Sequence, residues 1–67
     1  MDLPYLYGGE REVLALVAEG ASNSDIARRL FLSDKTVRNY VSTIFAKIDV
    51  TGRPEAIVRA REAGLGR

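Results

Sequence analysis

The sequence predicts an all-α fold, a four-helix bundle within a single domain over residues 1–67. Apolar residues make up 46% of the chain, which is enough for one small core at a size near the lower limit for independent folding. They recur at helical spacing and not in the alternation of a strand. Glycine, proline and short Ser/Asp clusters divide the chain into four segments of helix length.

The first helix is expected over 10–19, after an irregular lead-in at 1–8. Val13 and Leu14 would lie inward, and the acids of the first turn suit the positive end of the helix dipole. Gly20 is a natural stop for this helix.

The second and third helices are separated by a very short connection. Ser22 begins a capping signal in which Asp25 follows three residues later, and the second helix would end near Leu30. Ser33 is a good N-cap for a third helix over 34–48. Because only about three residues join these helices, they must cross steeply, which is the geometry of a helix-turn-helix.

The third helix has two unlike faces. Val37, Val41 and Ile44 share an apolar arc. The opposite arc has no glutamate and mixes cations with hydrogen-bonding side chains: Lys35, Arg38, Asn39, Ser42 and Thr43. Such a face can bind phosphates and read base edges.

A fourth helix is expected over about 54–63. Proline suits a first helical position, so Arg53-Pro54 marks the start of this helix, and Gly64 ends it. Asp49 is expected to close the preceding helix in the left-handed conformation, which aspartate tolerates better than most residues.

Charge is distributed unevenly along the chain despite a net charge of +1. Residues 1–27 carry five acids and one base, residues 28–47 carry five bases and one acid, and residues 48–67 are near neutral. A basic middle segment indicates a face directed at a polyanion.

The composition argues against several classes of chemistry. With no cysteine and no histidine, disulfides, imidazole bases and the usual zinc sites are excluded, and no metal or cofactor is expected. Glu10, Glu12 and Glu19 have no nucleophile or phosphate loop nearby, so an enzyme is not expected. Uncharged runs are too short to span a bilayer and no secretory pattern is present, which fits a cytoplasmic protein with no membrane partner.

One block of the sequence resembles a known family at fixed spacing. The block contains Ile26-Ala27, Leu30, Leu32-Ser33, Lys35-Thr36-Val37 and Val41. With the flanking EREVLALVAEG and GRPEAIVRAREAGL, the chain from Leu6 to Leu65 resembles the LuxR-type helix-turn-helix domain, the output module of NarL/FixJ-type response regulators and of small stand-alone regulators. The resemblance implies a sequence-specific regulator of transcription that binds double-stranded DNA, with the third helix as recognition helix.

The chain departs from this family at its start. The family usually opens with Leu-Thr-x-Arg-Glu, whereas this chain has Leu6-Tyr7-Gly8-Gly9-Glu10, without the threonine cap or the arginine. The first turn of the first helix is therefore expected to lack its capping hydrogen bonds and to fray.

By resemblance, the third helix enters the major groove and the second helix crosses the backbone. The expected base readers are Arg38, Asn39 and Ser42, because arginine matches guanine, asparagine matches adenine and serine either donates or accepts. Arg28 and Arg53 are weaker candidates for phosphate contact. The expected phosphate ligands are Ser22, Asn23, Lys35, Thr36 and Lys47.

The resemblance also implies a homodimer that pairs through the fourth helix on DNA. Val58 lies on the side of that helix away from the core, and charged neighbours complete the candidate interface: Glu55, Arg61 and Glu62. Single exposed valines are common, so Val58 also fits an ordinary surface. A receiver domain, absent from this chain, and RNA polymerase are further candidate partners.

Two other interpretations stay open. A helical protein-interaction module could bind an acidic partner through the basic face, although this does not explain why Asn39 and Ser42 share that face with Arg38. The promoter-reading domain of a sigma factor also has four helices, but the block GRPEAIVRAREAGL favours the LuxR type.

Overall fold

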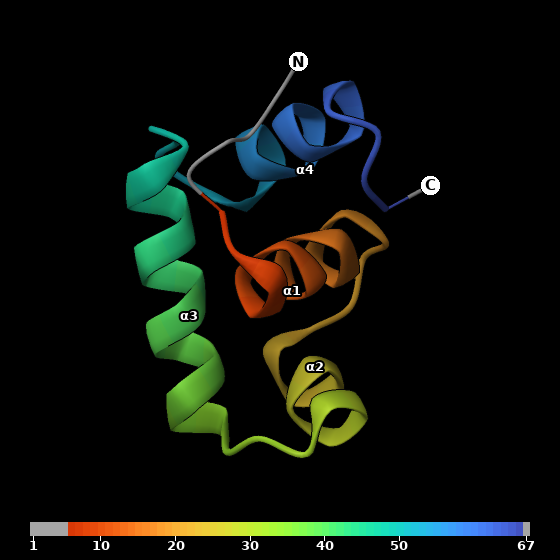
Figure 1. The fold of residues 1–67 in the computed structure, drawn as a ribbon, viewed down its shortest axis with the longest axis vertical. Helices are drawn as coiled ribbons and strands as arrows, with labels where there is room; N and C mark the ends of the chain where they lie inside the picture. Colours follow the sequence, from red (N-terminus) through yellow and green to blue (C-terminus); the bar gives the residue numbers. More distant parts are fainter. Residues whose placement is uncertain (1–5, 67) are drawn as a thin grey trace.

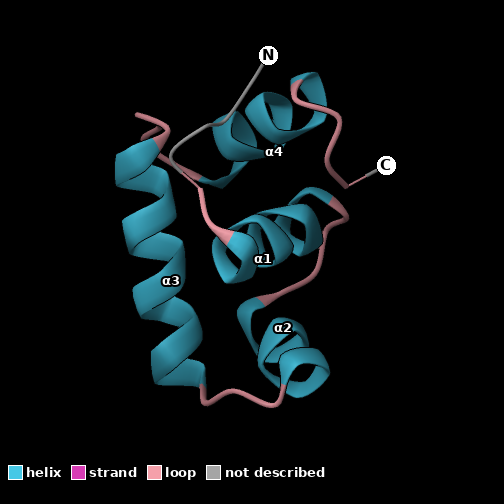
Figure 2. Cartoon of the chain, in the orientation of Figure 1, coloured by secondary structure: helices cyan, strands magenta, loops and turns pink. Residues whose placement is uncertain are grey.

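The computed structural model describes residues 6–66, and within that range the chain forms four helices and no strand (Figures 1 and 2). Helix α3 stands along one side of the molecule, and α4, α1 and α2 lie beside it in that order from top to bottom (Figure 1). The predicted all-α fold is confirmed. The helices are α1 (Gly8–Ala18), α2 (Asn23–Leu30), α3 (Asp34–Lys47) and α4 (Arg53–Glu62).

Helix α1 is the centre of the fold because it packs against all three other helices, while α2 packs against α3. Helix α4 buries Ala56 and Ala60, whose small side chains allow a close approach between helices. The largest fully buried side chains are Leu14, Ile26, Ile44, Val13, Val17 and Val37, which come from α1, α2 and α3. The core therefore fixes α3 against α1 and α2 by its apolar face and leaves the opposite face outward.

Each helix ends in a Schellman motif, in which a residue in the left-handed conformation follows the last turn. An N–H just beyond the helix then donates to the carbonyl five residues earlier, as Leu32 N does to Ala27 O at 2.9 Å. Gly20, Phe31, Asp49 and Gly64 have the positive φ at the four ends. The predicted conformation of Asp49 is confirmed, whereas no sequence signal predicts a positive φ at a bulky Phe31.

The start of α1 differs from the prediction. The helix begins at Gly8, two residues earlier than expected, because the Tyr7 N–H donates to Glu10 Oε1 at 3.1 Å. The N-cap side chain makes no capping hydrogen bond, as expected, but the expected loss of all capping is wrong, because glutamate at the third helical position can accept from the N-cap N–H without a threonine. Leu6 is buried in the core, and residues 1–5 of the predicted lead-in lie outside the described residues.

Candidate nucleic-acid interface

The outer face of α3 presents polar side chains that the fold does not use. Lys35, Arg38, Asn39 and Ser42 are exposed, and none of them forms a hydrogen bond or ion pair among residues 6–66. The three expected base readers thus share one exposed helix face with the lysine that was expected to bind phosphate.

The start of α3 is held by a cap that also orients Thr36. Ser33 Oγ accepts from the Thr36 N–H at 3.1 Å, and the Ser33 hydroxyl lies 2.9 Å from Thr36 Oγ1 in a second hydrogen bond. Thr36 is half-buried. When Ser33 donates to Thr36 Oγ1, the threonine keeps its own hydroxyl hydrogen for another acceptor, so its predicted role at a phosphate is compatible with the cap.

The start of α2 carries the predicted capping box. Ser22 Oγ accepts from the Asp25 N–H at 3.1 Å, and the Ser22 N–H donates to Asp25 Oδ2 at 3.2 Å. Hydrogen bonds with Ser22, first from its backbone, and then the neighbouring Arg28 guanidinium hold the pKa of the Asp25 carboxyl below its ordinary value. Ser22 is therefore a cap, and Arg28 is paired with Asp25 in the free chain.

Asn23, another expected phosphate ligand, is half-buried at the first position of α2. Its Oδ1 atom is buried and has no hydrogen-bond partner among the described residues. The Asn23 side chain is therefore turned partly inward and is less exposed to solvent than the polar side chains on the outer face of α3.

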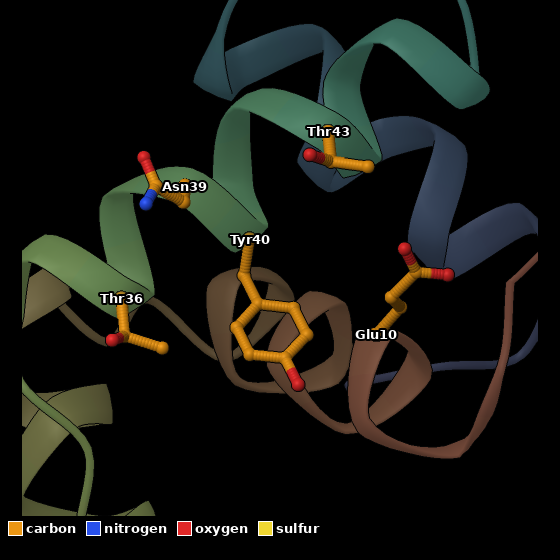
Figure 3. Close-up of a pocket in the computed structure, with 5 residues that line it drawn as sticks. All are labelled: Glu10, Thr36, Asn39, Tyr40 and Thr43. Atoms are coloured by element: carbon orange, nitrogen blue, oxygen red, sulfur yellow. The ribbon is translucent and has the colours of Figure 1, made fainter.

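A concavity lies between α3 and the start of α1, and Figure 3 shows the side chains that line it. Tyr40 packs half-buried against the core, with its ring between the two helices. Thr43 is exposed four residues after Asn39, so the two share one side of α3. The sequence interpretation gave Thr43 no contact of its own, although this spacing indicates one. The complete lining is Glu10, Thr36, Asn39, Tyr40 and Thr43.

Lys47 lies apart from the other expected phosphate ligands. Its Nζ atom is 2.8 Å from Glu10 Oε1 and 4.9 Å from the centroid of the Tyr7 ring. The hydrogen bond from Lys47, followed by the one from the Tyr7 backbone, holds the pKa of the Glu10 carboxyl below its ordinary value. The ammonium is thus already bound to an oxyanion within the fold.

The charged residues of α4 are also engaged by the chain. Arg53, a weaker phosphate candidate, donates to Ala21 O at 2.9 Å, so its guanidinium holds the loop before α2. Glu55 accepts from the Thr51 N–H at 3.0 Å. Arg61 donates to Ala18 O at 3.2 Å.

Two of the residues proposed for a dimer interface, Glu55 and Arg61, therefore already have intramolecular partners. Glu62 is exposed, and Val58 is 58% exposed. This makes Val58 the natural centre of any contact on this face of α4.

Between residues 6 and 66, no group of three or more His, Cys, Asp or Glu residues could hold a metal ion. In the same range, no helix combines the length and apolarity needed to cross a membrane.

Comparison with known proteins identifies the family. Residues 9–60 match the family described as bacterial regulatory proteins, luxR family. The chain belongs to the luxR family. The matched segment contains all of α2 and α3, and with them the whole outer face of α3.

Several luxR-type relatives align with most of this chain. The spore germination protein GerE of Bacillus subtilis (strain 168) is 41% identical over 61 residues, which cover 91% of this chain and 82% of GerE. The transcriptional regulatory protein DesR of the same organism is 49% identical over 55 residues, covering 82% of this chain and 28% of DesR. The DNA-binding transcriptional activator DevR/DosR of Mycobacterium tuberculosis is 49% identical over 53 residues, covering 79% of this chain and 24% of that protein. The chain spans about a quarter of the length of these last two relatives.

Proposed function

We propose that this luxR-family chain binds double-stranded DNA sequence-specifically and regulates transcription, with α3 in the major groove. The observation that carries the proposal is the outer face of α3, where Lys35, Arg38, Asn39 and Ser42 are exposed and have no partner among residues 6–66. A helix fixed by its buried face and open on its polar face matches the recognition helix of a helix-turn-helix.

The proposed readers differ in the bases that they suit. Arg38 can donate two hydrogen bonds to guanine O6 and N7, and Asn39 can pair with adenine N6 and N7. Ser42 can donate or accept, while the methyl group of the nearby Thr43 suits a thymine methyl. One good bidentate pair discriminates between bases by about 1–3 kcal/mol, so Arg38 and Asn39 carry most of the proposed specificity.

The proposed phosphate contacts surround these readers. Lys35 supplies an open ammonium, and Thr36 supplies a hydroxyl at the start of α3. Ser22 and Asn23 lie at the start of α2, where the positive end of the helix dipole and the first free amides attract a phosphate. Lys47 joins this set only when it leaves Glu10.

Fluorescence anisotropy with a labelled duplex at several salt concentrations tests DNA binding. Each phosphate that a lysine or arginine of the chain neutralises should make the plot of log affinity against log salt steeper by about 0.9, because the contact releases counterions. A binding signal that does not change with salt would refute the proposal.

We also propose that two copies pair on DNA through α4, centred on Val58 and flanked by Glu55, Arg61 and Glu62. Because Val58 is exposed at the middle of the helix, Val58→Arg should prevent the second copy from joining the complex while single-copy binding persists. Analytical ultracentrifugation of the variant on and off DNA measures this, and unchanged dimer assembly on DNA would count against α4 as the interface.

We also propose two partners for this chain, a receiver domain and RNA polymerase. The relatives DesR and DevR/DosR are about four times longer than the matched segment, which leaves room in them for a further domain. We propose a receiver domain that gates access to DNA as a partner of this chain. A cytoplasmic regulator that acts by binding, and not by catalysis, would contact RNA polymerase at a promoter. Retardation of the protein–DNA complex in a native gel on addition of RNA polymerase tests that contact, and a mobility unchanged by the polymerase would argue against it.

A further inference from the structure

The ion pair between Glu10 and Lys47 joins the first turn of α1 to the last turn of α3. The two residues are 37 positions apart in sequence, and Lys47 Nζ lies 2.8 Å from Glu10 Oε1. Only 12% of the Glu10 side chain and 30% of the Lys47 side chain are exposed. The Tyr7 ring lies 4.9 Å from the ammonium, and the Tyr7 N–H donates to the same carboxylate oxygen.

This arrangement distinguishes Lys47 from the other lysine of α3. Lys35, near the start of the helix, is exposed and has no ion pair among the described residues. Lys47 is bound to a carboxylate oxygen at a distance typical of a charge-assisted hydrogen bond. A phosphate oxygen makes the same kind of bond with an ammonium, so the Glu10 carboxylate and a DNA phosphate are competing oxyanions for the position of the Lys47 ammonium.

We propose that Glu10 is a positioning residue for DNA binding, which competes with the DNA backbone for the Lys47 ammonium and withholds one phosphate contact from the recognition helix. The proposal rests on the DNA-binding function proposed above. The pair holds the ammonium beside α1 with the Lys47 side chain only 30% exposed, so reaching a phosphate of bound DNA requires the ammonium to move away from Glu10. In either position the negative carboxylate repels the phosphate. Both effects oppose the contact for every DNA sequence, because a phosphate carries no base information.

The decisive variant is Glu10→Gln. The glutamine oxygen can still accept from the Tyr7 N–H, so the cap of α1 has a replacement, but the charge that holds Lys47 is gone. Anisotropy titrations should show tighter binding to a selected duplex and to a scrambled duplex by the same factor. The slope against log salt should become steeper by about 0.9, so that the gain shrinks about threefold between 50 and 200 mM salt.

Glu12→Gln is the matched control. Glu12 is an exposed acid of the same helix and has no ion pair among residues 6–66. Its removal changes the net charge by the same amount and should leave the salt slope unchanged. Equal slopes in the Glu10 and Glu12 variants, or weaker binding after Glu10→Gln, would overturn the proposal.

Lys47→Gln completes the test, and as a single variant it does not depend on how well Glu10→Gln folds. In the wild-type background this change should leave the salt slope nearly unaltered, whereas combined with Glu10→Gln it should remove the extra 0.9. A slope that becomes shallower by about 0.9 in the single Lys47 variant would show that Lys47 already contacts a phosphate and would disprove the competition. Loss of salt-dependent binding by the wild-type chain would instead refute DNA binding itself.

Discussion

Helices α3 and α4 each carry three cations, but within the described residues the fold engages one of the three in α3, Lys47, and all three in α4. In α3, Lys35 and Arg38 have no intramolecular partner within residues 6–66. In α4, each arginine donates a hydrogen bond to a backbone carbonyl of another segment: Arg53 to Ala21 O, Arg59 to Ile48 O and Arg61 to Ala18 O. Charge alone therefore does not distinguish a binding face from a structural one.

The positions of the acceptors explain the difference. Ala18 is the last residue of α1, and Ile48 follows the last residue of α3, so both carbonyls lie where a helix leaves acceptors without intrahelical partners. A guanidinium at this negative end of the helix dipole is favourable. Helix α4 thus ties down the ends of its neighbours, and α3 keeps its polar face for a ligand.

The largest expected effect concerns the structural cations. Arg59→Ala should lower the free energy of unfolding by about 1.5–3 kcal/mol, the range for a hydrogen bond to a charged group, because Ile48 O loses its donor. Urea unfolding followed by circular dichroism measures this. Arg38→Ala is the matched control and should change stability by less than about 0.5 kcal/mol, as is usual at exposed sites. If both variants are destabilised equally, the fold does not depend on Arg59 of α4 more than on Arg38 of α3.

For the open cations of α3, the expected effect is on DNA binding and not on stability. Arg38→Ala should reduce the preference for the selected site over a single-base variant by about 1–3 kcal/mol, because a bidentate contact with a base is lost. Lys35→Ala should weaken all duplexes similarly and make the salt slope shallower by about one unit. Anisotropy with matched duplexes separates the two effects. If both variants lose specificity and salt dependence equally, Arg38 is not a base reader distinct from a phosphate contact at Lys35.

The smallest expected effect concerns the turn between α2 and α3. The left-handed conformation costs a residue with a side chain roughly 1–2 kcal/mol, while glycine loses about 0.5–1 kcal/mol of chain entropy. Because the Phe31 side chain is 94% exposed, Phe31→Gly should stabilise the protein by about 0.5–1 kcal/mol. Thermal unfolding measures this change, and Phe31→Ala, which keeps the strained φ, should bring no comparable gain. A destabilised glycine variant would mean that the Phe31 side chain contributes to the fold.

The elements of the fold were predictable because their signals are local. The Ser22/Asp25 box and the Ser33 cap each lie within a few residues of the helix start that they define. The apolar arc of α3 likewise follows from spacing along one segment, which is why the exposed positions of Arg38 and Asn39 were also predicted.

The partners of individual charges were not predictable in this way. Glu10 lies 37 positions from Lys47, and Ala18 lies 43 positions from Arg61. No local pattern brings such pairs together, because their approach depends on how α1 packs against α3 and α4. For the same reason, Lys47 and Arg61 looked available in the sequence and are engaged in the structure.

Selection of binding sequences from a random duplex pool tests the central claim, that the open face of α3 reads DNA, most directly. The wild-type chain should enrich one short motif, and Arg38→Ala should enrich the same motif with the preference lost at one base pair while the others are kept. If the wild-type chain enriches no motif, or if Arg38→Ala selects the wild-type motif unchanged, α3 does not read DNA through this face.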